Sequence, residues 1–490
     1  MREHVTRIAD GDPGVLTTEP VQLLEPTSGS TGPNRLVPYT ATLRRQFQRA
    51  VKAWVWHTAD EFPAAFSGRS YWSISPPGQQ PASTPAGIPI GFDDDAAYLA
   101  RHQRWLLDRL LVRPPPQALR PSPDRSLDNF RFATLLCLVA AEDLSLISVW
   151  SPTFLLGLVE AMEQWRELVC TSLATGRVQL PGPPDRVLIE SLQRQIGRQP
   201  HRAAECIRLA GEPFEQLWPR LGLVSCWGDG ASARFLPELV QQFPTTPVQP
   251  KGLLATEGVV TIPRAGDDGS VLAMRSHVFE FLPVSRSSTT SEDLTRLPRE
   301  LTTGELYEVV ITTGGGLYRY RLGDTVEVVG WERETPRLRF VARRGTVSDI
   351  VGEKLNEYHV QSTLDSAIST TGLDANLALL TPVRADRPGY RLFLQTNSRF
   401  TANQLKGVAG LVESGLCDNP NYDLARRLGQ LQPLCISGWR GTDGWQRVER
   451  AAMDRGRALG DIKPASLDTW DGWDEVLGDL VQLQVAAESR

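Results

Sequence analysis

Apolar and polar positions follow two different periods along the chain, and these periods separate helices from strands. Residues 40–57, "TATLRRQFQRAVKAWVWH", repeat apolar positions at helical spacing behind a threonine cap, and residues 151–173 begin with Ser-Pro, a typical helix start. The stretches "LGLVSCW" (221–227), "GELYEVVITT" and "DTVEVVGW" have the apolar run or the alternation of strands. A further helix is expected from 93–95 to about Val112. Strands alternating with helices predict an α/β fold.

The pattern also indicates more than one domain. A chain of 490 residues is too long for a single compact core. After residue 344 the pattern predicts shorter strands and helices in mixed order, such as "YRLFLQT" and "NYDLARRLGQL". We therefore expect a domain boundary at this point.

Composition and charge exclude several classes of protein. With 52 basic against 57 acidic residues, nothing favours binding to nucleic acid or to an anionic membrane. The longest apolar stretch is broken by Glu142 and Asp143, so we expect no membrane span. No signal-peptide pattern follows Met1, and the six cysteines form no C-x-x-C pair. These features predict a cytoplasmic protein with structural thiols and no zinc site, and they leave its oligomeric state undefined.

Lysine is rare in this chain. Only five of the 52 basic residues are lysines, at positions 52, 251, 354, 406 and 463, and the others are arginines. Genome composition is the simplest cause of such a bias. Because a compact ammonium group and a planar guanidinium differ in chemistry, a lysine kept in this background is a weak candidate for a functional role.

The polar loop "TSGSTGPNR" has the chemistry of a phosphate cradle. Glycines allow close approach of the backbone, hydroxyls and N–H groups can donate to an anion, and Arg35 can clamp it. The loop fails the Walker pattern, so a P-loop is not predicted. An ordinary Ser/Gly turn is an equal alternative.

Three other stretches also carry candidate chemistry. "SCWGDGASA" matches G-x-G-x-x-A between a strand and a helix, although no acidic residue follows at the ribose-binding distance, so a nucleotide-edge turn or a plain tight turn is preferred. "LLATEG" puts Glu257 after a strand, where a carboxylate can hold Mg²⁺ or be a surface side chain. In "GGGLYRYRLGDTVEVVGW", Asp324 can accept hydrogen bonds from vicinal hydroxyls or occupy a hairpin turn.

The order of these pieces resembles the Gretchen Hagen (auxin-responsive promoter) family of acyl acid amido synthetases, which are adenylate-forming enzymes. The resemblance covers nearly the whole chain and is carried by "IADGDPGVLTTEPVQLLEPTSGSTG", "KGLLATEG", "HVFEFLP", "GLYRYRLGD", "FVARRGTVSDIVGEKLNE" and "NYDLARRLGQL". It implies the firefly luciferase-like, adenylate-forming α/β fold. Residues 1–343 would form a large N-terminal domain that binds ATP and the acyl substrate, 344–352 a hinge, and 353–490 a smaller, mobile α+β C-terminal domain.

The resemblance also implies roles for individual residues. Glu257 would bind Mg²⁺, Asp324 the ribose hydroxyls with help from Arg343, and Lys463 in "GDIKP" would swing in to the acyl-phosphate centre. Lys354 matches the lysine of the family's hinge region. Ser28, Gly29, Ser30, Thr31, Gly32 and Arg35 would hold the β- and γ-phosphates of ATP, and Gly228, Asp229 and Gly230 would lie by the adenine. Thr256 would contact the α-phosphate and, with Lys354 and Lys463, act in catalysis.

Three features depart from the family pattern. Leu253 stands where the family has an aromatic residue, and Arg35 where it usually has lysine. The segment before "IADGDPG" is also shorter than in the family, so we expect either a truncated start or the loss of an outer helical layer.

The implied reaction has two steps. A small carboxylic acid attacks the α-phosphate of MgATP and releases pyrophosphate, and an amine, typically an amino acid, then attacks the acyl carbon. Two alternatives remain: an acyl-CoA or carrier-protein ligase that shares the first step, and a nucleotide-binding pseudoenzyme. The scattered arginines of the C-terminal region form no tight basic cluster for CoA phosphates, which favours the amino acid.

Overall fold

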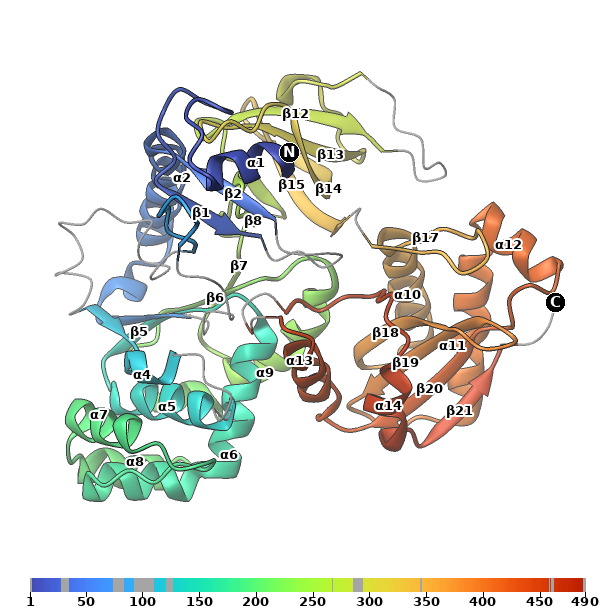
Figure 1. Cartoon of the computed structure of the whole chain (residues 1–490). Coiled ribbons are helices and arrows are strands. Elements are labelled where there is room, and N and C mark those ends of the chain that lie inside the picture. Colours follow the sequence, from blue (N-terminus) through green and yellow to red (C-terminus); the bar gives the residue numbers. More distant parts are fainter. Residues whose placement is uncertain are drawn as a thin grey trace.

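A computed structural model describes residues 2–27, 35–73, 83–91, 110–119, 127–266, 268–284, 294–343, 346–457, 459 and 462–487. It contains three larger β-sheets that are surrounded by helices (Figure 1). The helices predicted at 40–57 and 151–173 are confirmed as α2 (Ala41–Glu61) and α6 (Pro152–Thr175). The Oγ atoms of Thr40 and Ser151 accept from the first free N–H groups of these helices, which fixes where each begins.

The first sheet is parallel, has five strands and follows the order β4-β3-β5-β6-β7. Its strands are β3 (Arg69–Trp72), β4 (Leu111–Val112), β5 (Leu144–Ser148), β6 (Leu223–Cys226) and β7 (Val248–Pro250). The predicted strand at 221–227 is thus confirmed. Residues 93–109 of the helix expected to reach Val112 lie outside the described residues. Its predicted end is wrong, because Leu111 and Val112 pair with Ser70 and Tyr71 of β3 as a sheet edge.

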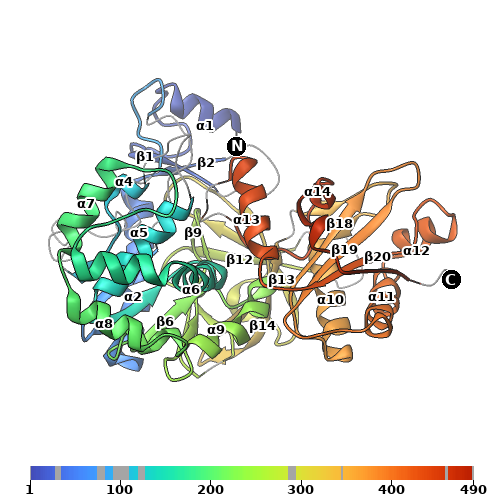
Figure 2. The same ribbon diagram turned by 90° about the horizontal axis from the view of Figure 1, so that it is seen from below.

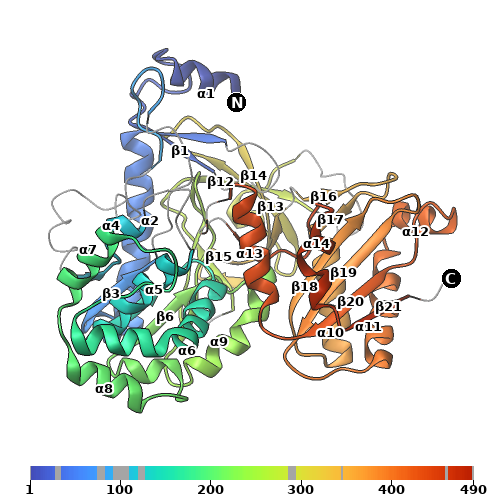
Figure 3. The same ribbon diagram turned by 60° about the horizontal axis from the view of Figure 1, so that its bottom comes forward.

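Helices cover the two faces of this sheet unequally. The alternation of side chains along the strands puts Tyr71, Ile147 and Val224 on one face, in the main core with the helices of one flank. These helices are α4 (Pro116–Leu119), α5 (Leu127–Ala140), α6, α7 (Arg186–Ile196), α8 (Pro200–Arg208) and α9 (Leu236–Gln242). The other face meets α2, since Trp54 of α2 contacts Trp72 of β3. Figures 2 and 3 show α5–α8 gathered on one flank and α2 beyond them.

The second sheet is antiparallel and has six strands in the order β10-β11-β15-β14-β13-β12. Its strands are β10 (Thr261–Ile262), β11 (Ser270–Leu272), β12 (Val278–Pro283), β13 (Leu306–Thr312), β14 (Tyr320–Glu332) and β15 (Thr335–Arg343). The two alternating strands expected at 304–313 and 324–331 are confirmed as β13 and β14. Two small hairpins adjoin this sheet, formed by β1 (Leu23–Pro26) with β2 (Leu36–Tyr39) and by β8 (Leu254–Ala255) with β9 (Gly258–Val259).

The third sheet follows the order β18-β19-β20-β21 and belongs to the last third of the chain. It contains β18 (Ala375–Val383), β19 (Gly389–Thr396), β20 (Cys435–Arg440) and β21 (Leu483–Ala486), and a short hairpin, β16 (Val347–Ser348) with β17 (Leu355–Asn356), precedes it. The helices of this part are α10 (Glu357–Thr371), α11 (Ala402–Leu416), α12 (Pro420–Arg427), α13 (Gly444–Asp454) and α14 (Trp473–Leu477). The expected hinge at 344–352, between an N-terminal domain of residues 1–343 and a C-terminal domain of residues 353–490, stays a prediction. None of the helices in the described ranges is apolar over enough residues to cross a membrane.

Helix α13 returns from the last third of the chain to the flank of the first sheet, beside α6 and α9 (Figures 1 and 2). Trp445 packs on Phe235 with ring centroids 5.6 Å apart, in the same core as the helices of that flank. The guanidinium of Arg131 on α5 forms an ion pair with the Glu449 carboxylate, and both side chains are buried. Burial raises the pKa of Glu449, while Arg131 and the indole of Trp445 favour its ionised form. A buried, hydrogen-bonded ion pair therefore joins two distant parts of the chain.

Removing one member of this pair should be costly. Glu449→Ala leaves the Arg131 guanidinium buried without its partner, so we expect a loss of about 3–5 kcal/mol of unfolding free energy in urea titrations. The matched control is Glu190→Ala, which breaks an exposed pair with Arg186 and should cost less than about 1 kcal/mol. Equal losses in the two variants would contradict the importance of burial.

Candidate active site

Asp324 and Arg343 form the centre of the candidate site. They are partners in the β14–β15 ladder, and Arg343 Nε lies 3.8 Å from Asp324 Oδ1. Asp324 is 6% exposed, which rules out the alternative that it is an ordinary turn side chain. Burial raises its pKa, whereas the charges of Arg343 and Lys463 oppose this shift. The site thus holds a buried carboxylate between two cations, one of which comes from the last part of the chain.

Thr256 and Glu257 occupy the turn between β8 and β9, next to Asp324. The hydroxyl of Tyr39 donates to the carbonyl oxygen of Thr256 at 2.5 Å. Glu257 is 4% exposed, so it is not a surface glutamate. Burial is the main cause of its raised pKa, and the Asp324 carboxylate adds to it, so the two acidic groups lie near enough for their charges to interact. The adjacent Gly258 has no room for a side chain, because a Cβ there would lie 2.6 Å from the ring of His277.

The predicted phosphate loop falls mostly outside the described residues: Ser28, Gly29, Ser30, Thr31 and Gly32 all lie there. Its two ends are described and are held together, since Thr27 N–H donates to the Arg35 carbonyl at 2.7 Å at the end of the β1–β2 hairpin. Arg35 Nη1 lies 3.4 Å from the hydroxyl of Tyr320. Tyr320 also interacts with Glu257. Burial is the main cause of the raised pKa of Tyr320, and the charge of Glu257 raises it further. Arg35, Tyr320 and Glu257 therefore connect this loop to the Asp324 centre.

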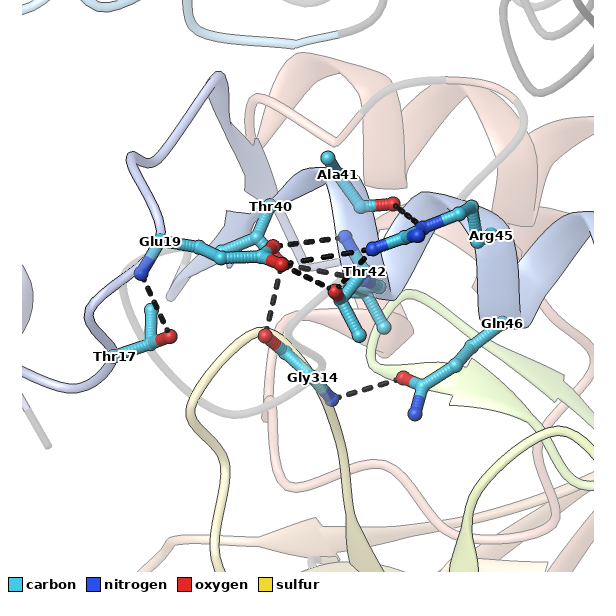
Figure 4. A network of polar contacts seen from close by, with 9 residues as sticks. Thr17, Glu19, Thr40, Ala41, Thr42, Arg45, Gln46 and Gly314 are labelled. Carbon is cyan, nitrogen blue, oxygen red and sulfur yellow. Dashed lines mark hydrogen bonds and ion pairs between the residues drawn. The ribbon is translucent and has the colours of Figure 1, made fainter.

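A polar network fixes the start of α2 beside the glycine-rich turn that precedes Tyr320 (Figure 4). The Glu19 carboxylate accepts from the N–H and hydroxyl of Thr42, at 3.0 and 2.5 Å, and these bonds lower its pKa. On the other side, Thr40 Oγ1 donates to the Gly314 carbonyl and Gly314 N–H donates to Gln46 Oε1. The network holds the helix after the phosphate loop and the turn before Asp324 in a fixed relation.

The turn Gly228–Gly230 packs against β15. Gly230 has a φ of +60°, and a Cβ at this position would lie 3.1 Å from the ring of Phe340. The Asp229 carboxylate accepts from Phe340 N–H at 3.3 Å, and burial raises its pKa to about 6. The turn predicted to lie by the adenine is thus beside the strand that carries Arg343.

The two candidate lysines occupy different surroundings. Lys463 Nζ lies 4.4 Å from the ring centroid of Trp227, and its charge acts on Asp324. Lys354 lies in the β16–β17 hairpin with an unusual φ of +47°, and its carbonyl accepts from Asn419 Nδ2 at 3.5 Å. Among the described residues, no contact joins Lys354 to the Asp324 centre. The structure therefore brings Lys463, and not Lys354, to the candidate site, and the catalytic roles of both stay predictions.

Sequence reasoning missed Glu357, which is the first residue of α10. Burial raises its pKa to about 7, although hydrogen bonds from Ser466 and Thr346 and the charge of Arg343 favour the ionised form. Ser466 belongs to the same segment as Lys463. The only local signal was the helix cap Asn356, which predicts a helix start and no contact with Arg343.

Glu357→Gln should change the pH dependence of stability. The folded protein favours the neutral carboxyl, so the stability that this acid contributes is present below its ordinary pKa and is lost as the pH rises through about 7. The neutral, isosteric glutamine should therefore add roughly 2–3 kcal/mol of unfolding free energy near pH 8 and less than about 1 kcal/mol near pH 5. Thermal melts across this range test it against Glu163→Gln on the exposed side of α6, where we expect no pH-dependent gain.

The site's acidic groups suit a Mg²⁺–nucleotide substrate. Within the described ranges, no group of three or more His, Cys, Asp or Glu side chains could hold a metal ion by itself. Mg²⁺ needs no such group when it is bound through phosphate oxygens and one or two carboxylates. Burial and the charge of Asp324 raise the pKa of Glu257, and a bound cation would favour its ionised form. Glu257 therefore fits the role of such a ligand.

The chain matches two described domains of a known family: the GH3 family N-terminal domain over residues 1–248 and the GH3 family central domain over residues 270–343. A probable indole-3-acetic acid-amido synthetase from Oryza sativa subsp. japonica is 27% identical over 411 residues, which are 74% of this chain and 65% of that protein. A jasmonoyl–L-amino acid synthetase from Nicotiana attenuata is 25% identical over 447 residues, 85% and 75% of the two chains. The match thus spans slightly less than two thirds of the rice protein.

A solved structure shares the fold. The acyl acid amido synthetase AtGH3.15, in complex with 2,4-DB, superposes with a TM-score of 0.84 over 99% of this chain and 87% of that chain, at 18% sequence identity. The predicted adenylate-forming α/β fold is therefore confirmed. With half of its residues matched by the N-terminal domain alone, this chain belongs to the GH3 family.

Proposed function

We propose that this protein is an ATP-dependent acyl acid amido synthetase, which adenylates a small carboxylic acid and transfers the acyl group to the amine of an amino acid. The observation that carries the proposal is the convergence of Asp324, Glu257 and Lys463 on one buried centre from three distant parts of the sequence. Family membership supports the same reaction, because the relatives described above are named as amido synthetases.

Each residue has a distinct task in the first step, in which an acid oxygen bonds to the α-phosphorus of ATP and pyrophosphate leaves. Asp324 accepts from the ribose hydroxyls, and the charge of Arg343 favours the ionised form of that carboxylate. Lys463 neutralises charge that develops on the phosphoryl oxygens, where a fixed cation in a buried site is most effective. Glu257 would hold Mg²⁺, which when bound supplies further positive charge at the phosphates.

The second step breaks the acyl–phosphate bond. The amine nitrogen attacks the acyl carbon, AMP leaves, and the amine loses a proton to form the amide. Activation as an acyl-AMP makes this attack feasible, because AMP is a far better leaving group than the oxide of a free carboxylate. Rotation of residues 353–490 about 344–352 would exchange the Lys463 segment for a different surface between the steps. It would also have to separate α13 from the flank of the first sheet, where Glu449 pairs with Arg131.

Incubation with ATP, Mg²⁺ and a panel of aryl and aliphatic acids, together with either CoA or mixed amino acids, tests the proposal. We expect AMP formation that requires both an acid and an amino acid and does not respond to CoA, and mass spectrometry should detect the amide. Acyl-CoA without any amide would establish the ligase alternative, and ATP binding without acid-dependent pyrophosphate release would establish the pseudoenzyme.

A further inference from the structure

Four aligned residues line one face of the parallel sheet near its carboxyl edge. Trp72 of β3 pairs with Ser148 of β5, Ser148 with Ser225 of β6, and Ser225 with Gln249 of β7. Side chains at the same level of neighbouring parallel strands point to the same face of a sheet. This is the face toward α2, because Trp54 of that helix contacts both ends of the row, Trp72 and Gln249.

A second level of side chains follows two residues further along three of these strands. Trp150, Trp227 and Lys251 come after β5, β6 and β7, and the period of two keeps them on the same face. Trp150 and Trp227 have ring centroids 5.7 Å apart, and Lys251 Nζ lies 4.6 Å from the ring centroid of Trp150. Lys251 Nζ also lies 5.8 Å from the ring of Trp54. We call Trp54, Trp72, Trp150, Trp227 and Lys251 the tryptophan cluster.

The row beneath the cluster contains polar atoms that the protein leaves unpaired. Ser148 Oγ, Ser225 Oγ and Gln249 Nε2 are buried and have no hydrogen-bond partner among the described residues. The three residues are 2%, 1% and 4% exposed. Leaving a buried polar atom unpaired costs free energy, so three of them in one row need an explanation. A ligand that brings its own donor or acceptor atoms to this row supplies one.

The cluster also has accessible surface and a connection to the active site. All four tryptophans are only partly buried, so their rings retain surface that a ligand can cover. The Lys463 ammonium lies over the ring of Trp227, and its charge also favours the ionised form of Asp324. The polar row lies two residues deeper along the strands, about 6–7 Å from the cluster level and roughly one aromatic ring further from the reacting centre.

The geometry points to the tryptophan cluster as the acyl-binding site, selective for an aromatic acid with a hydrogen-bonding group at the end of the ring remote from its carboxylate. This inference rests on the proposed function. The carboxylate lies toward Lys463, the indole rings pack on the aromatic ring, and Lys251 favours an anionic ligand. The remote group meets Ser148, Ser225 and Gln249 and satisfies their unpaired atoms. The carboxyl edge of a parallel sheet is where open α/β folds commonly bind ligands.

Three acids of matched shape test the selectivity of the wild-type protein by calorimetry without ATP. Phenylacetate should bind several-fold more tightly than cyclohexylacetate, since ring–ring contacts add to area burial. 4-Hydroxyphenylacetate should bind about tenfold more tightly than phenylacetate, since its hydroxyl pairs with the polar row. Equal affinity for all three acids, or no saturable binding of any at millimolar concentration, would overturn the inference.

Matched variants locate the binding site. Trp54→Leu and Lys251→Met should each weaken 4-hydroxyphenylacetate binding about tenfold. Their controls are Trp56→Leu, a 63% exposed residue on the same helix, and Lys52→Met, an exposed lysine of α2, and both should bind as wild type does. Ser225→Ala makes a small change and should remove the preference for the hydroxylated acid without lowering phenylacetate affinity. Circular dichroism establishes that each variant is folded.

The failure of this inference is distinguishable from failure of the proposed function. Acid-dependent pyrophosphate release with wild-type affinity in Trp54→Leu, Lys251→Met and Ser225→Ala would overturn the binding site and leave the reaction standing. Tight, variant-sensitive acid binding with no pyrophosphate release would support the site and refute the reaction.

Discussion

Replacing Asp324 with alanine is expected to abolish acid-dependent pyrophosphate release and to lower ATP affinity at least tenfold. The proposed ribose hydroxyls donate to a carboxylate, and each such charge-assisted bond is worth about 1.5–3 kcal/mol. The fold should survive, because burial already opposes the charge of Asp324 and its removal relieves that cost. Calorimetric titration with ATP and a pyrophosphate-release assay measure the two effects.

The same strand supplies the control for Asp324. Glu327 lies in β14, but it pairs with Arg339 at 3.0 Å and is more exposed. Glu327→Ala should leave ATP affinity and pyrophosphate release within about twofold of wild type, as for most exposed ion pairs. Unchanged ATP binding in Asp324→Ala would remove this carboxylate from the nucleotide site.

The parts of the fold that the sequence predicted are those with local causes. Thr40 and Ser151 cap their helices with their own side chains, and the apolar run of β6 reflects burial of all four of its residues. The helix end predicted at Val112 is wrong because its structure has a non-local cause. Pairing with β3, more than 35 residues earlier in the chain, makes Leu111 and Val112 a strand edge, and this contact has no trace in the local pattern.

The candidate site divides in a similar way. Glu257, Asp324 and Arg343 lie within recognisable motifs, so their residue types and order identify them without a structure. The position of Glu357 beside Arg343, and the stacking of Lys251 and Lys463 on tryptophans, depend on packing between segments far apart in sequence. The tryptophans themselves are conspicuous at three strand ends, but only the sheet order makes them neighbours.

Two of the five lysines lie over tryptophan rings near the candidate site. Of the five lysines, Lys463 lies over the ring of Trp227 and Lys251 over the ring of Trp150, and these two rings of the tryptophan cluster are neighbours. Lys354, which also falls on a family motif position, lies in the β16–β17 hairpin. The two lysines at family motif positions thus have different surroundings in the structure, and comparing them is a direct test of the mechanism.

Lys463→Ala is expected to slow pyrophosphate release by about a hundredfold or more, while ATP affinity changes only a few-fold. A cation that acts on charge developing in the transition state contributes to kcat far more than to ground-state binding. Lys463→Arg should recover little of the lost rate, because a planar guanidinium does not replace a compact ammonium between Trp227 and Asp324. Initial rates at saturating ATP and acid, with calorimetric ATP titrations, separate these effects.

Lys354→Ala is the matched control for this experiment, because it removes an exposed lysine from the same part of the chain. We expect its rate of pyrophosphate release to stay within about threefold of wild type, since no charge developing at the phosphates lies beside it. Wild-type turnover in both Lys463 variants, together with a large loss in Lys354→Ala, would transfer the catalytic role to the hairpin lysine. That result would also mean that adenylation takes place in a different arrangement of the last third of the chain, one that brings β16 and β17 to Asp324.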